Sequence, residues 1–523
     1  WLGAVMGELN GLANVRLMTR TTAFGAYDNL VFGLLERVGD HLPVPGPGQP
    51  RQRYWILRTR QAVLATGMLE RPVVFGNNDL PGVMLASAGR SYINRYAVVA
   101  GRKIVVFTNN DTAYSAALDL AASGVDVAMV DVRSAISAEL QRAAREAGVA
   151  SHLGCAVARA NGSKRVRSVE VCAFDSAHAK IGAAKLRLPC DLLLVSGGWT
   201  PTLQLLGQRG AKPVYDEKRA MLVAAHIPRG YRVAGSASGE LSLRLRVAGG
   251  LKEGSAAAEA CGFTASPERE SVGATLADER IMTDIAPVAA IADPPGAGYR
   301  KKFVDFQHDV SYDDIALALS EGYESIEHLK RYTTLGMALD QGKTSSVNAL
   351  AIVAQMLGRP INALGTTTFR PPYRPVAIGA LAGPETGQHF KPIRRSPMHD
   401  LHAHNGAVFT TTGFWLRPWY YPKPGETLRD AYIREADAVR KSVGMVDVSS
   451  LGKIDVQGPD AAEFLNRIYT NGFDTLAIGK ARYGVMLRPD GIVVDDGTTS
   501  RISEHHYFMT TTTTGAGKVM TFL

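Results

Sequence analysis

Residues 102–131, with the sequence RKIVVFTNNDTAYSAALDLAASGVDVAMVD, decide the fold class of this chain. An apolar run follows Arg102, alanine and leucine residues then recur with helical spacing over 113–123, and a second apolar run covers 126–131. A strand, a helix and a strand within about 30 residues form the crossover unit that joins neighbouring strands of a parallel sheet. This stretch therefore predicts an α/β fold.

Strands that end in glycine occur on both sides of this unit. Residues 61–67 read QAVLATG, residues 191–198 read DLLLVSGG, and residues 233–239 read VAGSASG. A glycine at the carboxyl end of a strand lets the backbone approach a dinucleotide closely, and a helix that starts there can place N–H groups on phosphate. The alternative is that these glycines serve only the turns. The arrangement resembles flavoproteins with two dinucleotide-binding domains, in which a second sheet interrupts the first.

The second sheet carries an unusual loop between its first strand and helix. A G-x-G-x-x-G sequence is typical of a dinucleotide-binding site at this position, but residues 108–113 read TNNDTA. These side chains would crowd a pyrophosphate, and Asp111 would repel it. We therefore expect the inserted domain to bind no dinucleotide. Asp131 could still bind a ribose hydroxyl, but the role we expect for it is that of an ordinary residue at a strand end.

Changes in composition divide the chain into five parts. We expect an outer dinucleotide-binding domain (1–100 and 200–263), an inserted Rossmann-like domain (101–199), a linker (264–299), a small, mostly helical domain (300–390) and an α+β domain (391–523). The linker is expected because Pro, Ala, Glu, Asp and Gly dominate it and periodicity is weak. Helices are expected over 312–320, 345–357, 429–443 and 460–468, with a strand over 453–457 and a hairpin turn at Asp490-Gly491.

The two ends indicate a piece of a longer protein. The chain begins at Trp1 without a methionine and stops at Leu523, inside an expected helix that begins at Gly517. We therefore expect the outer domain to lack its own glycine-rich loop and the last domain to lack its second half.

Composition and charge exclude several classes of protein. Hydrophobic residues make up 46% and charged residues 20% of the 523 residues, as in folded proteins, and no apolar run approaches the roughly 18 residues of a membrane helix. The net charge is +9, but Lys and Arg are scattered, so we expect anionic cofactors or an acidic partner and no nucleic acid. The four cysteines form no C-x-x-C motif, which favours a reducing, cytoplasmic compartment without disulfides or zinc.

Residues 336–344, GMALDQGKT, are similar to a phosphate-binding loop. A true P-loop is unexpected, because five residues separate the two glycines and no apolar strand precedes them. A helix expected to open between Gln341 and Ser346 could still hold one phosphate with its N-terminus and Lys343. The alternative is a solvated lysine.

Three histidines, His399, His402 and His404, have the spacing of metal ligands if the segment is helical. Pro397 and Gly406 favour a loop, and no cysteine or glutamate completes a ligand set. We expect no metal at this position.

Asp495 and Asp496 follow the apolar residues 492–494 of an expected strand. Side chains alternate along a strand, so only one carboxylate can face a pocket near Tyr483. A half-buried carboxylate there could bind or accept a proton from an amine-bearing ligand. The alternative is an acidic pair in solvent.

These features, in this order, resemble the alpha subunit of heterotetrameric sarcosine oxidase. The motifs that carry the resemblance are 20–28 (RTTAFGAYD), 65–72 (ATGMLERP), 107–114 (FTNNDTAY), 304–310 (VDFQHDV), 330–337 (KRYTTLGM), 340–344 (DQGKT) and 365–373 (GTTTFRPPY). From about Pro392 the chain also resembles the folate-binding aminomethyltransferase (T-protein) of glycine cleavage. This second resemblance rests on 443–453 (VGMVDVSSLGK), 458–461 (GPDA) and 490–496 (DGIVVDD).

The resemblance implies a function for the whole complex. It would oxidatively demethylate sarcosine to glycine, form hydrogen peroxide and pass the one-carbon unit to tetrahydrofolate. A beta subunit would carry FAD and covalently held FMN, the alpha subunit would hold NAD and contribute to the FMN site, and small gamma and delta subunits would complete the complex.

The resemblance also implies site residues. NAD would contact Thr22, Ala23, Ala65, Thr66, Gly67 and Gly235. The Asp495–Asp496 pair would supply the carboxylate that positions folate, with Tyr483 on the strand that faces the pocket. For the phosphate of FMN we expect Lys343 and Thr344, because they precede a helix.

The small helical domain resembles the iron–sulfur modules of related amine and opine oxidases. The cysteines of those modules correspond to Asp305, Gln307, Asp340 and Ser345. Because none of these residues is a cysteine, thiolates cannot hold a cluster here and we expect none.

Two other classes of function stay open at this point. A stand-alone NAD(P)H-dependent flavin oxidoreductase would need redox-active cysteines or an intact second glycine loop. A non-catalytic scaffold subunit of an amine or opine oxidase would be compatible with the loop around Asp111.

Overall fold

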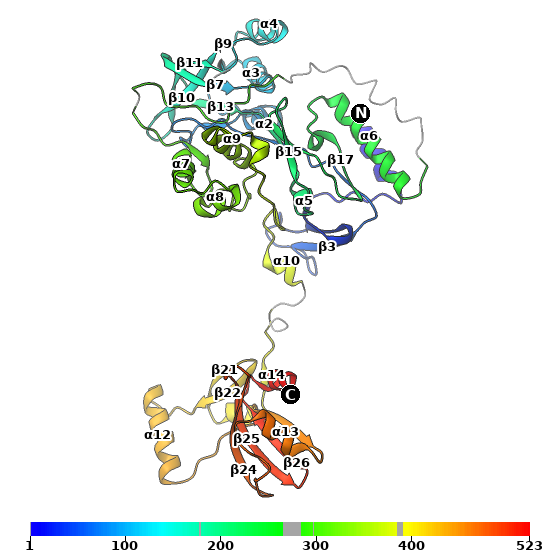
Figure 1. Cartoon of the computed structure of the whole chain (residues 1–523), viewed down its shortest axis with the longest axis vertical. Coiled ribbons are helices and arrows are strands. Elements are labelled where there is room, and N and C mark those ends of the chain that lie inside the picture. The colour runs from blue at the N-terminus through cyan, green and yellow to red at the C-terminus, as the bar shows by residue number, and fades with distance from the viewer. Residues whose placement is uncertain (1, 177–178, 265–283, 297, 384–386, 388–390) are drawn as a thin grey trace. The chain divides into compact units, whose positions relative to one another are not determined.

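The computed structural model describes residues 2–176, 179–264, 284–296, 298–383, 387 and 391–523 (Figure 1). The chain forms two compact units, Trp1–Leu381 and Ala382–Leu523, which we call the first and second units. Each unit is described by itself.

A five-stranded parallel sheet lies at the centre of the inserted domain. Its strands are, in order, β6 (Val83–Leu85), β13 (Leu192–Ser196), β7 (Lys103–Thr108), β8 (Asp126–Asp131) and β9 (Ala150–Leu153). Its helices are α2 (Ala86–Tyr96), α3 (Thr112–Ala122) and α4 (Ala138–Glu146). The predicted crossover unit is confirmed as β7, α3 and β8, with Lys103 beside Asp126 in a parallel register.

Both faces of this sheet are buried. On β7, Ile104 and Val106 pack with the helices, while Val105 and Phe107 face a three-stranded antiparallel sheet on the other side. That second sheet consists of β10 (Cys155–Gly162), β11 (Val166–Asp175) and β12 (Lys180–Pro189). A parallel strand covered on both faces reads as a continuous apolar run, which is why the strand could be recognised in the sequence.

The outer domain is built from chain segments before and after the inserted domain. Its elements are α1 (Leu2–Gly11), β1 (Thr21–Tyr27), a 3-10 helix (Asp28–Leu30), β2 (Val31–Arg37), β3 (Gln52–Arg58), β4 (Ala62–Leu64), α5 (Gln204–Gly207), β15 (Pro213–Asp216), β16 (Met221–Ala224), β17 (Tyr231–Val233), a 3-10 helix η2 (Gly235–Ser238) and α6 (Leu243–Ala260). Strands β4 and β17 are parallel neighbours, with Val233 opposite Leu64. Two strands from distant parts of the sequence thus end at the same edge.

The chain crosses between the two domains on a pair of antiparallel strands, β5 (Met68–Glu70) and β14 (Trp199–Pro201). Arg71, which is 4% exposed, fixes this crossing by donating hydrogen bonds to the carbonyls of Trp199 (2.8 Å) and Ala220 (2.6 Å). Gly198, at φ +102°, leaves room for that guanidinium, since a Cβ there would lie 3.0 Å from Arg71 Nη2. Burial lowers the pKa of Arg71 to about 10, so the group stays charged at neutral pH.

Part of the expected linker belongs to the folded core. Ala290 pairs with Val74 in a parallel bridge, the Ala286 amide donates to the Asn109 carbonyl (2.8 Å), and Ile291 is 1% exposed. The apolar residues between 285 and 291 provide enough burial to hold this stretch against the inserted sheet. Residues 265–283 of the expected linker lie outside the described residues.

The small domain after residue 299 packs three helices around an apolar core. Its elements are β18 (Phe303–Asp305), β19 (Val310–Ser311), α7 (Tyr312–Ser320), α8 (Ile326–Thr333), α9 (Ser346–Leu357), a 3-10 helix (Ile361–Ala363) and α10 (Ile378–Ala382). Helix α7 begins with a capping box between Ser311 and Asp314, which satisfies backbone donors at both residues. The predicted helices over 312–320 and 345–357 are confirmed.

The second unit is α+β. An antiparallel sheet orders β23 (Gly452–Gln457), β26 (His506–Thr511), β25 (Val493–Ser503) and β24 (Ala481–Leu487), and α13 (Ala461–Ile468) and α14 (Ala516–Phe522) pack against it. The other elements are β20 (Arg394–Arg395), α11 (His399–His404), β21 (Val408–Thr412), β22 (Trp415–Tyr420) and α12 (Leu428–Lys441). The helices and strand predicted here, and the turn at Asp490-Gly491, are confirmed. None of the described helices is both long and apolar enough to span a bilayer.

The unusual loop of the inserted domain is filled by its own side chains. Asn109 Nδ2 donates to the Ala286 carbonyl (2.8 Å), and Asn110 Nδ2 donates to Asn109 Oδ1 (2.9 Å). Arg133 forms ion pairs with Asp111 (2.6 Å) and with Asp131 (2.7 Å), whose side chain has no exposed surface. Asp131 is therefore used inside the protein, in agreement with the structural role expected for it.

The Arg133 ion pairs provide a test of the fold. We expect Arg133→Met to lower the free energy of unfolding by about 3–5 kcal/mol, because it leaves two buried carboxylates without a cation. Urea denaturation followed by circular dichroism measures the change. The matched control is Arg142→Ala. Arg142 forms an exposed pair with Glu146 at 3.9 Å, so this substitution should lower the free energy of unfolding by less than about 0.5 kcal/mol. Equal losses in the two variants would contradict this role of the buried network.

Candidate functional site

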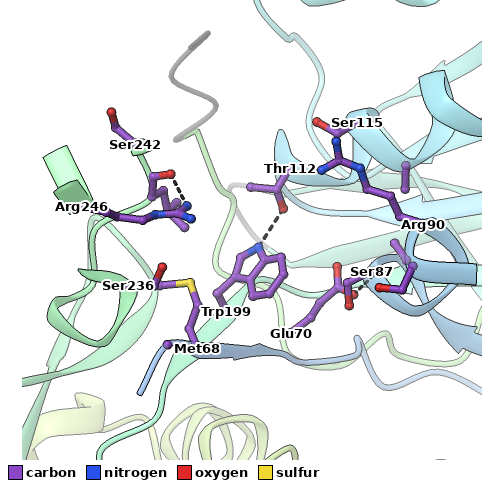
Figure 2. Close-up of a pocket in the computed structure, with 15 residues that line it drawn as sticks. Met68, Glu70, Ser87, Arg90, Thr112, Ser115, Trp199, Ser236, Ser242 and Arg246 are labelled. Atoms are coloured by element: carbon purple, nitrogen blue, oxygen red, sulfur yellow. Dashed lines mark hydrogen bonds between the residues drawn. The ribbon is translucent and has the colours of Figure 1, made fainter. Parts of the chain in front are cut away.

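A pocket of about 730 Å³ lies between the outer and inserted domains of the first unit, and we call it the interdomain pocket (Figure 2). Its walls come from β5, β14, η2 and the first turns of α2, α3 and α6. Helix N-termini carry partial positive charge and unpaired N–H groups. A helix start in this cavity therefore favours a ligand with negative charge where its N–H groups are not already bonded.

Trp199 and Glu70 stand side by side in the interdomain pocket. They are directly opposite each other in the pairing of β14 with β5, so their side chains share one face of the ribbon. The indole Nε1 of Trp199 donates to Thr112 Oγ1 (2.9 Å) at the start of α3. Figure 2 shows the indole between Met68 and Ser236 on one side and Glu70 and Ser87 on the other. The indole orientation is thus fixed from the inserted domain.

Glu70 is a buried carboxyl group, 4% exposed. It accepts a hydrogen bond from the Ser87 amide (2.7 Å) in the first turn of α2. Burial raises the pKa of Glu70 above its ordinary value, and hydrogen bonds from Ser196 and Ser87 oppose that shift. The groups that hold this carboxyl are therefore neutral ones.

Two arginines flank the interdomain pocket. Arg90 Nε donates to Asp119 (2.6 Å), so its charge is balanced by a neighbour on α3. Arg246, on the first turns of α6, donates to the carbonyls of Glu240 (3.1 Å) and Leu241 and has no carboxylate partner among its described contacts. Its positive charge is available to a ligand on this side of the cavity.

The structure brings part of the predicted NAD residues together. Ala65, Thr66 and Gly67 follow β4, Gly235 follows the neighbouring strand β17, and the Ala234 amide donates to the Leu64 carbonyl (3.0 Å). Gly67 lines the interdomain pocket, while Thr66 Oγ1 donates to the Thr202 carbonyl (2.6 Å). Gly235 has φ +65° and open space where a Cβ would lie, so a ligand can approach its backbone.

The other two predicted NAD residues lie on a different strand. Thr22 and Ala23 belong to β1, where they pair with Leu35 and Leu34 of β2. Ala23 packs with the apolar cluster of the outer domain.

Lys343 and Thr344 have different surroundings. Lys343 Nζ donates to the Tyr373 carbonyl (2.8 Å) and lies 4.8 Å from the centre of the Tyr373 ring. Burial and the charge of Arg374 lower the pKa of Lys343. Thr344 lines a separate pocket of about 270 Å³, and helix α9 begins only at Ser346. Lys343 is thus neither fully solvated nor directed at the same space as Thr344.

The positions that correspond to cluster cysteines stabilise loops of the small domain. Asp305 accepts hydrogen bonds from the amides of Gln307 (3.0 Å) and Gly336 (2.7 Å), and Asp340 accepts one from Gly342 (3.2 Å). Ser345 is 2% exposed. Within the described ranges, no three His, Cys, Asp or Glu side chains are grouped so that they could hold a metal ion.

The histidine segment forms a helix, α11, so the expected loop over residues 399–404 is wrong. Pro397 precedes the helix and Gly406, at φ +74°, follows it, so both residues bound the helix without interrupting it. His402 is buried, with Nδ1 2.6 Å from the Tyr421 hydroxyl and Nε2 3.0 Å from Asp447 Oδ2. This histidine belongs to a network inside the second unit.

The two carboxylates of β25 face different partners. Asp496 accepts a hydrogen bond from the hydroxyl of Tyr483 (2.5 Å), a side chain that is 57% exposed. Asp495 is 5% exposed and accepts a hydrogen bond from Thr512 Oγ1 (3.1 Å). Gly515 must lack a side chain here, because a Cβ would lie 1.8 Å from Asp495 Oδ2. Asp496 is therefore the carboxylate on the side of Tyr483.

The sequence did not single out Glu70 and Trp199, which the structure places in the interdomain pocket. Each follows a Gly-terminated strand, in the runs ATGMLERP and SGGWTP. The available signal was the repetition of that pattern, because the residues that follow the two strands pair with each other as β5 and β14.

The parallel inserted sheet, the paired strand ends and the pocket between two domains define the class of protein, an α/β fold in which a Rossmann-like domain is inserted into an outer domain. The crystal structure of L-proline dehydrogenase from P. horikoshii shares this fold, with a TM-score of 0.53 and 21% identity over 73% of this chain and 68% of that one. The predicted α/β fold class is confirmed.

Residues 299–384 match the sarcosine oxidase A3 domain, and residues 398–523 match the GCVT N-terminal domain. The chain is 46% identical to the sarcosine oxidase subunit alpha of Rhizobium meliloti (strain 1021), over 99% of this chain and 50% of that protein. It is 43% identical to the same subunit of Corynebacterium sp. (strain U-96), over 100% of this chain and 54% of that protein. The predicted resemblance to sarcosine oxidase alpha subunits is confirmed, and the chain spans about half the length of these curated relatives.

The buried network around Asp447 predicts a pH dependence of the second unit. Burial alone would raise the pKa of Asp447, but hydrogen bonds from Ser396, Ser449 and His402 outweigh it and hold that pKa well below its usual range. The stabilisation is therefore present above pH of about 4, the pKa of an unfolded aspartate, and is lost as the pH falls toward the folded value. Urea midpoints of wild type and Asp447→Asn should differ at pH 7 and converge toward pH 3.

The control for this experiment is Asp437→Asn. Asp437 pairs with Lys441 (2.7 Å) on an exposed helix face, and such pairs contribute little. A difference between wild type and Asp447→Asn that stays constant from pH 7 to pH 3 would show that the charge of Asp447 is not what stabilises the unit.

Proposed function

We propose that this chain belongs to the alpha subunit of a sarcosine oxidase complex, which oxidatively demethylates sarcosine. Sarcosine, tetrahydrofolate and oxygen give glycine, 5,10-methylenetetrahydrofolate and hydrogen peroxide. Two electrons leave the N-methyl group and reduce oxygen to peroxide, and the one-carbon unit passes to tetrahydrofolate. The observation that carries the proposal is the 46% identity to a sarcosine oxidase subunit alpha over 99% of this chain.

NAD would bind the outer domain. The supporting observation is that Ala65, Thr66 and Gly67 end beside Gly235, at an edge that opens into the interdomain pocket. Thr22 and Ala23 complete the proposed set through the resemblance alone. When bound, NAD would supply a nicotinamide ring and a pyrophosphate, and the first turn of α6 with Arg246 would offer positive potential to the latter.

Tetrahydrofolate would bind the second unit. The match of residues 398–523 to the GCVT N-terminal domain supports this assignment. We assign Asp496 the contact with folate, because its carboxylate lies on the side of the exposed Tyr483, and Asp495 the support of the adjoining turn through Thr512. Tyr483 would hold the Asp496 carboxylate in place through the hydrogen bond that its hydroxyl donates.

The amine-oxidising FAD and a covalent FMN would be carried by a beta subunit, with small gamma and delta subunits completing the complex. The relatives are named subunit alpha, which supports a multi-subunit assembly. Lys343 would contact the phosphate of FMN, because its half-buried ammonium is suited to an anion. Thr344, which lines a separate pocket, is assigned to the FMN site only by its place before helix α9. We place the complex in the cytoplasm, in keeping with four cysteines that form no disulfide with one another.

The proposal is tested on the complex purified from its native cell. We expect this chain to co-purify with a subunit that carries covalent flavin, and peroxide to form only when sarcosine and both chains are present. A protein that purifies alone, carries its own flavin and oxidises NAD(P)H would instead be the stand-alone oxidoreductase. If the assembly forms no folate-dependent product, this chain would instead be a non-catalytic scaffold subunit of an amine or opine oxidase.

A variant of the folate site sharpens this test. Asp496→Asn should lower the yield of 5,10-methylenetetrahydrofolate at least tenfold and raise free formaldehyde correspondingly. Peroxide should stay unchanged, because amine oxidation takes place on the partner. The control is Asp490→Asn, in the exposed turn between β24 and β25, which should leave both products as in wild type. If Asp496→Asn also transferred the one-carbon unit normally, the folate role of Asp496 would be excluded.

A further inference from the structure

We propose that the outer edge of strand β3 is a docking site for an extended, acidic segment of another subunit, which adds a strand to the sheet formed by β1, β2 and β3. We call this surface, residues 51–60, the β3 edge. It lies in the outer domain, and its residues line neither of the pockets described above. The inference goes beyond the proposed function and does not depend on which reaction the complex carries out.

Backbone groups on one side of β3 have no partner in the part of the chain that the structure describes. Strand β2 is the one neighbour of β3 in its sheet. The Thr59 amide, directly after β3, donates to the Leu30 carbonyl (3.1 Å) on the side of β2. Because backbone groups alternate in direction along a strand, those of Tyr54, Ile56 and Arg58 point away from β2. Such a row of free N–H and C=O groups is a template for another strand.

The other edge of the same sheet is covered. The Phe24 carbonyl of β1 accepts a hydrogen bond from the Tyr373 amide (3.0 Å), and the Ala26 amide donates to Gln208 Oε1 (2.8 Å). Later parts of the chain therefore satisfy the edge of β1. The edge of β3, which is as long as an ordinary strand, is left open to a partner.

The middle of the β3 edge is apolar and exposed. Ile56 and Leu57 are 63% and 44% exposed, and as neighbours in a strand they stand on opposite faces of the sheet. An added strand would cover part of both side chains and gain from their burial. Trp55 lies between two cations, with its ring centre 4.4 Å from the guanidinium carbon of Arg16 and 5.6 Å from that of Arg53. Tryptophan and arginine are the residue types that contribute most at protein interfaces.

Positive charge decides which segment can bind. The sequence of residues 51–60, RQRYWILRTR, contains four arginines and no acidic residue. Arg53 pairs with Glu36 (3.0 Å), but no carboxylate of the described residues pairs with Arg58 or Arg60. A second copy of this chain would place arginines opposite arginines, and like charges directly opposite each other destabilise a strand pair. The surface therefore favours a segment with an apolar centre and Asp or Glu near both ends.

Hydrogen exchange tests whether a strand is added. The exchange rates are compared, residue by residue, between the complex purified from its native cell and the full chain alone. We expect the outward amides of Tyr54, Ile56 and Arg58 to exchange at least tenfold more slowly in the complex. The amides of Trp55 and Leu57 face β2 and should be protected in both samples. Equal rates at the outward amides in the two samples would overturn the proposal.

Carbodiimide coupling tests the chemistry and the source of the partner, because this reagent joins lysine amines to carboxylates and leaves arginine unreacted. In the complex, Arg58→Lys with Arg60→Lys keeps the positive charge and should couple to Asp or Glu of a different subunit, identified by mass spectrometry. The control is Arg142→Lys with Arg145→Lys, at exposed positions of α4, which should give no link to that segment.

Charge reversal provides a second variant. Arg58→Glu with Arg60→Glu should return the outward amides to within threefold of their rates in the chain alone, whereas Arg142→Glu with Arg145→Glu should leave their protection unchanged. Links to a second copy of this chain, to another segment of this chain or to no carboxylate would overturn the assignment of the partner. Protection at the β3 edge in a complex that does not oxidise sarcosine would leave this inference standing while the proposed function fails.

Discussion

The buried guanidinium of Arg71 holds together the crossing between the two domains of the first unit. It donates to the carbonyl of Trp199 on one strand and to that of Ala220 beyond it, at 2.8 and 2.6 Å. Hydrogen bonds from a charged donor to a carbonyl in a dry interior are strong ones. Because neighbouring residues of a strand point to opposite faces, the same ribbon that buries Arg71 presents Glu70 to the interdomain pocket.

The loop 108–113 of the inserted domain and the strand end at Gly235 of the outer domain differ in how their polar groups are satisfied. In the inserted domain, Asn109, Asn110 and Asp111 fill the loop with their own hydrogen bonds, and Arg133 supplies the counter-charge from within the protein. In the outer domain, the backbone at Gly235 is left uncovered. The loop of the inserted sheet thus satisfies its polar groups internally, whereas the backbone at Gly235 in the outer domain is open to a ligand.

Local patterns predicted the parts of the fold whose burial is local. The sequence predicts the unit from 102 to 131 because both faces of β7 and β8 are apolar. It predicts helix α7 because the apolar residues between Tyr312 and Ser320 follow helical spacing. The composition of the stretch 284–291 predicts a linker, because the contacts that bury it come from Val74 and Asn109, far away in the sequence. Glu70 and Trp199 were missed for the same reason: only the pairing of β5 with β14 brings them together. Tyr483 and Asp496 could be linked in advance, since a short hairpin joins their strands.

The central claim is that the outer domain offers the open nucleotide edge and the inserted domain does not. A structure of the full chain determined in the presence of NAD⁺ tests this most directly. We expect one dinucleotide per chain, with its phosphates beside Gly67 and Gly235. Density for the nucleotide at the loop 108–113, with Arg133 displaced from Asp111 and Asp131, would contradict it.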